Sequence, residues 1–184
     1  MNNSIAKDHA WFTSYQPFPS QLTYIYAINP PIPVLGIGTI KLTVRATPGS
    51  FRTYGVSSIE LHTVLHLPEY FCNVLSRPLG DMHQISLDGA SHQAGPRSRG
   101  GLVLQNRQVA YFQPGPSGSF SLAVLPPDGM SFGSGVCSSG VNWAVSAHWP
   151  HVERVRWETV QARARLEHDL PRYQPPILCV RSSM

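Results

Sequence analysis

The sequence predicts a mainly β protein, a small β-barrel or sandwich followed by one C-terminal α-helix. Two observations predict the β part: the 184 residues include 17 prolines and 15 glycines, which is more than average usage, and the runs between them are short and rich in β-branched and aromatic residues. A third observation predicts the helix. From Pro150 to about Asp169 the chain has neither Gly nor Pro, and it mixes charged residues with valine, alanine and leucine.

The first half of the chain contains three expected strands. Leu22–Ile28 alternates and ends at Asn29-Pro30-Pro31, since proline cannot donate to a β-ladder. Val34–Val44 is the most strongly β-forming stretch, and Gly36 and Gly38 within it indicate a bulge or a close backbone approach. After a loop over Ala46–Ser58, the third strand covers Ile59–Leu67 and closes at Pro68.

The second half is predicted as shorter elements. Phe71–Leu75 suits a strand or a turn of helix, and Val141–Ala147 suits a strand or the approach to the helix. The other expected strands are Ile85–Leu87, then Leu102–Leu104 and Gln108–Phe112 joined by a tight turn at Asn106-Arg107, then Ser119–Leu125. Residues 88–101 are a polar connection. Pro150 fits the first turn of the helix, so we expect residues 1–147 to form the β domain and residues 148–184 a helical extension and tail.

Composition limits the function classes. The formal net charge is +4, which permits contact with nucleic acid but does not establish it, and no block of five or six like charges occurs. The three cysteines, Cys72, Cys137 and Cys179, form no C-x-x-C pair, so a four-ligand zinc site is not expected and free thiols are. Neither a secretory signal nor a membrane-spanning run is evident. We expect an intracellular protein, cytoplasmic or nuclear, with no membrane association.

Candidate sites for cofactors and metals are weak. Gly36-Ile37-Gly38 lacks the third glycine of a nucleotide-binding loop, and the residues after it continue as strand instead of opening a helix. His62 and His66 are four residues apart on an expected strand, where they point to one face but lie too far apart to share a metal easily. We therefore expect no cofactor and no metal.

Asp88 is the candidate catalytic residue. Retroviral-type aspartic peptidases use Asp-Ser/Thr-Gly, where two subunits each donate an aspartate and the pair shares one proton. In this chain Asp88 is followed directly by Gly89, without the hydroxyl residue, and Asp128-Gly129 has the same defect. The prediction is therefore that no catalytic residue is present, with Asp88 as the alternative.

Four segments in a fixed order carry a family resemblance: Asp8–Tyr15, Val34–Leu42, Leu61–Pro68 and Asn73–Ser76. They resemble the protease region of Copia/TNT-type retrotransposon Pol polyproteins, which has a D-x-x-W/L-F segment, a V-x-G-x-G-T/S-V strand, an L-x-x-V-L-H-x-P segment and N-L-L-S. The resemblance covers Ile5 to about Ser76 and implies a retropepsin-like small β-barrel. In the family the catalytic D-S/T-G-A/S lies just upstream of the segment matched by Lys7–Phe12, and here Met1–Ala6 contains no aspartate.

The resemblance implies a catalytically inactive, retrotransposon-derived barrel, either an interaction module or an element remnant. Its partner is an unknown protein, with self-association as one form. Two alternatives stay open. The first is a homodimeric aspartic peptidase using Asp88, and the second is a basic nucleic-acid-binding module, although acidic residues are interspersed along the helix. Its arginines would be Arg97, Arg99, Arg107, Arg154, Arg156, Arg163 and Arg165.

Overall fold

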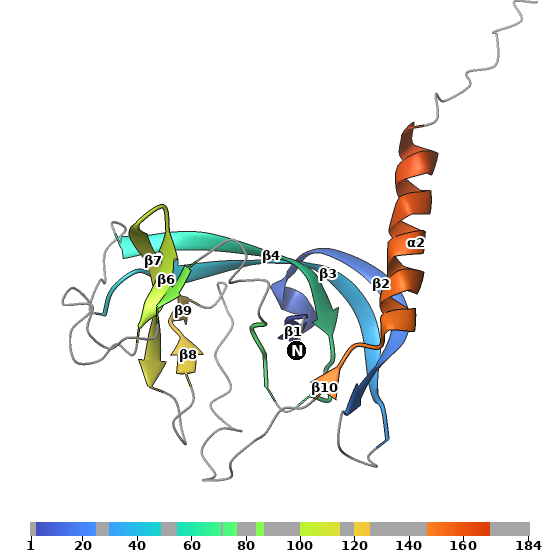
Figure 1. Ribbon diagram of the computed structural model, residues 1–184, viewed down its shortest axis with the longest axis horizontal. Helices are drawn as coiled ribbons and strands as arrows, with labels where there is room; N and C mark the ends of the chain where they lie inside the picture. Colours follow the sequence, from blue (N-terminus) through green and yellow to red (C-terminus); the bar gives the residue numbers. More distant parts are fainter. Residues whose placement is uncertain are drawn as a thin grey trace, which may run out of the picture. The chain divides into compact units, whose positions relative to one another are not determined.

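The computed structural model describes residues 3–24, 30–48, 55–70, 72–76, 84–86, 100–114, 120–125 and 147–169. The predicted class is confirmed: the chain is mainly β, with a sheet curled into a half-barrel and one C-terminal helix (Figure 1). It divides into two compact units, Met1–Pro150 and His151–Met184. Among the described residues, no helix has the length and apolar character needed to cross a membrane.

Three long antiparallel strands form the half-barrel: β2 (Phe12–Tyr24), β3 (Ile32–Arg45) and β4 (Val56–His66). Figure 1 shows these strands curving together along their length. Two short strands extend the sheet to the order β1-β4-β3-β2-β10, and a third pairs with β3; they are β1 (Ile5–Ala6), β10 (Ala147–His148) and β9 (Val124–Leu125). β3 lies at the centre because it combines β-branched residues with buried positions on both faces.

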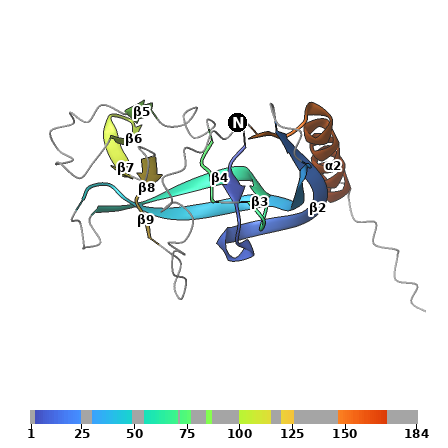
Figure 2. The ribbon, with the colours of Figure 1, turned by 90° about the horizontal axis from the view of Figure 1, so that it is seen from below.

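A second, smaller antiparallel sheet lies over one end of β3 and β4 (Figure 2). Its strands run in the order β5-β6-β7-β8 and cover β5 (Gln84–Ser86), β6 (Gly101–Leu104), β7 (Arg107–Pro114) and β8 (Phe120–Leu122). Leu102, Ala110 and Phe112 from this sheet pack against Leu42 and Ile59 of the half-barrel, and all five side chains are buried. The shared apolar core holds the two sheets together because burying such side chains removes their surface from water.

The predicted strands Val34–Val44 and Ile59–Leu67 are confirmed as β3 and β4, although β4 begins earlier, at Val56. The expected start of the preceding strand at Leu22 is wrong, since β2 begins ten residues earlier at Phe12. Pro17 and Pro19 argue against a strand in this first part of β2 when the sequence is considered alone. They are tolerated because β2 is paired on its outer side by β10 at Thr23 and Tyr24 alone within the described residues, and an edge strand accommodates proline.

The predicted hairpin is confirmed, but its turn is at Gln105-Asn106, one residue before the expected position, and Arg107 already pairs with Leu104. The single strand expected over Ser119–Leu125 is interrupted at Ala123, whose amide donates to the Tyr111 carbonyl and whose carbonyl accepts from Arg45. In the expected segment Phe71–Leu75, Val74 forms an isolated bridge with Ile5. Leu87 and residues 141–146 lie outside the described residues.

The C-terminal unit contains α2 (His151–Asp169), and the prediction of a helix here is confirmed. It starts directly after Pro150, which suits the beginning of a helix because proline lacks the amide proton that would have no partner there. Two ion pairs lie along it, each between residues one turn apart: Glu153 with Arg156 and Arg163 with Glu167, both at 3.0 Å. An exposed pair such as Arg163 with Glu167 adds only tenths of a kcal/mol.

Candidate functional site

The N-terminal segment lies along the end of β4 and joins two of the four resembling segments. Ile5 and Ala6 pair in parallel with Leu65 and His66. The amide of Leu65 donates to the Ser4 carbonyl over 2.9 Å, and the amide of Leu67 donates to the Ala6 carbonyl over 3.0 Å. Ile5 and Ala6 are buried, so this short strand contributes apolar contacts as well as hydrogen bonds.

The segment Asn73–Ser76 covers the other side of the same N-terminal residues. The backbones of Ile5 and Val74 exchange two hydrogen bonds, of 2.8 and 3.0 Å, and the Lys7 amide donates to Oδ1 of Asn73 over 2.8 Å. The hydroxyls of Ser4 and Ser76, both buried, are 3.2 Å apart. Together with the pairing of β2, β3 and β4, these contacts bring all four resembling segments into one hydrogen-bonded structure.

Gly36 and Gly38 on β3 provide the space into which aromatic side chains of β2 fit. A Cβ atom at Gly36 would collide with the ring and hydroxyl of Tyr15. A Cβ atom at Gly38 would collide with the backbone carbonyl of Ser14 and would lie 2.7 Å from the ring of Phe12. The prediction that these glycines mark a bulge or a close backbone approach is confirmed, because β3 and β4 also change register between Gly38 and Ile40.

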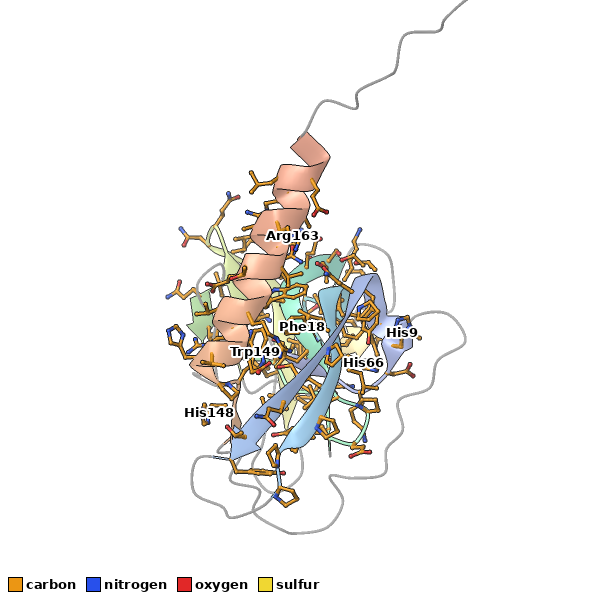
Figure 3. All side chains as sticks on the ribbon, turned by 90° about the vertical axis from the view of Figure 1, so that its right-hand side faces the viewer. His9, Phe18, His66, His148, Trp149 and Arg163 are labelled. Atoms are coloured by element: carbon orange, nitrogen blue, oxygen red, sulfur yellow. The ribbon has the colours of Figure 1, made fainter. Side chains whose placement is uncertain are left out.

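Four rings meet over these glycines and form what we call the aromatic cluster: His9, Phe12, Tyr15 and His66. His66 is the buried member, 7% exposed, and its ring centroid lies 5.5 Å from those of Phe12 and Tyr15 and 5.7 Å from that of His9, in edge-on arrangements. The Tyr15 hydroxyl lies 3.0 Å from Nδ1 of His66. Figure 3 shows His9 and His66 on the same side of the sheet.

The surroundings of His66 favour its neutral form. Burial lowers the pKa of His66, and the neighbouring His9 lowers it further, whereas a hydrogen bond with the Lys7 backbone and the carboxylate of Asp8 oppose them. Burial also raises the pKa of Tyr15, which therefore keeps its proton. The ring forms one hydrogen bond between Nδ1 and the Tyr15 hydroxyl and another with the Lys7 backbone.

A β-bulge determines where the two strand histidines point. β4 has two residues, His62 and Thr63, opposite the single Thr39 of β3, and Thr63 has a φ of 54°. His62 is exposed, with Nδ1 3.3 Å from the Thr39 hydroxyl, whereas His66 faces the aromatic cluster. The expectation that both point to one face is wrong, because the extra residue reverses the alternation between them. Within the described residues, no group of three or more His, Cys, Asp or Glu side chains is placed to hold a metal.

Several predicted site residues lie outside the described residues. Asp88, the candidate catalytic residue, is among them, as are Asp128, Arg97 and Arg99. Asp8 is described, and its carboxylate accepts from the Ala10 amide over 2.9 Å, which caps the 3₁₀ helix η1 (His9–Trp11). Sequence reasoning missed the aromatic cluster. The available signal was the spacing of Gly36 and Gly38 next to a segment with several aromatic residues.

Comparison of the chain with protein-family models, with curated proteins and with solved structures gives no match. The four resembling segments and the contacts that they make are the features that bear on function. Those contacts join β1, η1, β2, β3 and β4 around one buried histidine.

Proposed function

We propose that this chain is a retrotransposon-derived, retropepsin-like barrel that binds a protein partner and does not hydrolyse peptides. The observation that carries the proposal is the joining of the four resembling segments into a single hydrogen-bonded unit. Each motif residue in that unit has a packing or hydrogen-bonding role: Gly36 and Gly38 make room for rings, His66 contacts Tyr15, and Asn73 accepts from Lys7. A scaffold built in this way needs no catalytic aspartate to explain its residues.

The acidic residue beside the aromatic cluster also has a structural role. Asp8 caps η1 through the Ala10 amide, whereas a peptidase aspartate must face its counterpart from a second subunit across a water molecule. The nucleic-acid alternative gains little from the helix, because Arg156 and Arg163 are engaged by Glu153 and Glu167. These observations favour a protein-binding role over both the peptidase and the nucleic-acid-binding module.

The proposal is tested by assaying the full chain against a peptide library between about pH 4 and 7, with and without pepstatin. We expect no pepstatin-sensitive cleavage, and we expect the Asp88→Asn variant to behave as the wild type does. Cleavage that peaks in acid, is blocked by pepstatin and disappears in Asp88→Asn would instead establish the homodimeric peptidase. Sedimentation over a range of protein concentrations then tells whether a second copy is the partner.

A further inference from the structure

We propose that the aromatic cluster makes the contact between residues 4–11 and β4 sensitive to acid. Protonation of its buried imidazole loosens residues 4–11 from β4, while β2, β3 and β4 stay paired. We call residues 4–11 the N-terminal latch. This inference concerns a conformational change, and it holds whether the barrel is a binding module or an enzyme.

His66 connects the latch to the sheet. It belongs to β4, and it contacts β2 through the Tyr15 hydroxyl, 3.0 Å from its Nδ1, and through the edge-on ring of Phe12. It contacts the latch through a hydrogen bond with the Lys7 backbone and an edge-on contact with the His9 ring. Since the side chain is 93% shielded by its neighbours, water can do little to stabilise a charge on it. A proton on His66 therefore acts directly on the contact between the latch and β4.

The charged and titratable groups that face His66 come from two elements. Tyr15 lies on β2, and Lys7, Asp8 and His9 belong to the latch. His9 carries the like charge when both imidazoles are protonated, and the carboxylate of Asp8, already engaged by the Ala10 amide, opposes it. In the protonated ring Nδ1 can only donate, so the Tyr15 hydroxyl oxygen becomes the acceptor of this hydrogen bond.

The direction of the pH effect follows from the pKa of His66, which lies below its ordinary value of 6.5 in the folded chain. The folded state then binds fewer protons than the unfolded state. The stabilisation is complete above about pH 6.5 and is lost as the pH falls from there towards the lowered pKa.

The latch is the element that yields because fewer hydrogen bonds hold it than hold the sheet. It pairs with β4 at two positions, bridges to Val74 at one, and has further hydrogen bonds from Ser4 to Ser76 and from Lys7 to Asn73. By contrast, β3 pairs with β4 over nine residues and with β2 over eight. Local opening occurs first where the fewest buried hydrogen bonds must break. Acid is therefore expected to open the latch before the sheet.

Hydrogen exchange at about pH 7.5 and 5.5, corrected for intrinsic rates, tests the latch in the full chain. The amides of Leu67 and Val74 report on it, because they donate to Ala6 and Ile5, and the Ile37 amide of β3 reports on the sheet. We expect the protection of Leu67 and Val74 to fall by up to about tenfold between these two pH values, because pH 5.5 lies one unit below the ordinary imidazole pKa of about 6.5, with little change at Ile37. Equal loss at all three amides, or no loss at any, would overturn the proposal.

Two variants assign the effect to the cluster. His66→Gln keeps a hydrogen-bonding side chain but cannot titrate, so its latch protection should be independent of pH in this range. His62→Gln is the matched control, because His62 is exposed on the other face of β4 and should leave the pH dependence unchanged. If His66→Gln does not fold, the exposed His9→Gln serves: removing the like charge should reduce the loss of protection, and an undiminished loss contradicts the latch.

Discussion

Gly36 and Gly38 lie two residues apart on the same face of β3, and each has a different neighbour. The space next to Gly36 is filled by the side chain of Tyr15, whereas the space next to Gly38 is filled by the backbone carbonyl of Ser14. A ring can rotate away from an added methyl group, but a carbonyl within a paired strand cannot move without breaking the β2–β3 ladder. The two glycines are therefore unequal in how a substitution can be relieved.

A double-mutant cycle separates these two cases. Gly36→Ala should lower the free energy of unfolding by about 1–3 kcal/mol through overpacking, and most of that loss should vanish in a Tyr15→Ala background. Gly38→Ala should cost at least as much in both backgrounds. Urea denaturation followed by circular dichroism measures all five chains alongside the wild type. An equal loss for Gly36→Ala in the two backgrounds would show that Tyr15 is not the obstacle.

At the scale of elements, the β6–β7 hairpin turns through two residues in the left-handed region. Gln105 has a φ of 49° and Asn106 a φ of 61°, which corresponds to a type I′ turn that matches the twist of a hairpin. Asparagine tolerates this conformation, but glutamine gains nothing from it because its longer side chain makes no compact local hydrogen bond. The turn is therefore held in place by the strands it joins.

Replacing the turn by the favoured pair, Gln105→Asn with Asn106→Gly, should stabilise the protein by about 1 kcal/mol, because the cost of the left-handed conformation falls. The midpoint of urea denaturation should rise without a change in its slope. As a control, Asn106→Ala should lower the midpoint. A lower midpoint for the double variant would mean that the Gln105 side chain contributes contacts of its own.

The elements differ in how far the sequence predicts them. β3, β4 and α2 were predictable because their residues agree locally with their structures: β-branched runs in the strands and a stretch without Gly or Pro in the helix. The first part of β2 was not, because its prolines are permitted by an edge position that depends on the tertiary fold. The aromatic cluster could be predicted only in part. The glycines predict a close approach, but they do not identify the approaching ring, which is that of Tyr15, 21 residues before Gly36.

At the scale of the whole molecule, the last residues of the first compact unit, Ala147–Trp149, pack against its own sheet. β10 pairs with Thr23 and Tyr24 of β2, and the adjacent Trp149, 5% exposed, donates from Nε1 to the Ser20 hydroxyl over 2.9 Å. The contacts that complete this unit therefore lie within Met1–Pro150.

A chain shortened to end after Pro150 should keep the wild-type midpoint of urea denaturation. Trp149→Ala in the full chain should lower the free energy of unfolding by about 3–5 kcal/mol, because it removes a buried indole and leaves a cavity. Val152→Ala, at a side chain that is 74% exposed, is the control and should change little. A Trp149→Ala chain as stable as the control would show that Trp149 does not anchor the end of the unit.

The extra residue in β4 at the bulge has a consequence for the whole strand. Ile59 and Leu61 face Leu42 and Ile40, but beyond the bulge it is Val64 and His66 that face Gly38 and Gly36. On this face of β4 the residue numbers are therefore odd before Thr63 and even after it. Deleting this one residue would leave the composition of β4 almost unaltered, yet it would turn His66 to the opposite face of β4, where Leu65 is now fully buried, and Leu65 toward the cluster. The chemistry of the cluster therefore depends on a count of residues as much as on their identity.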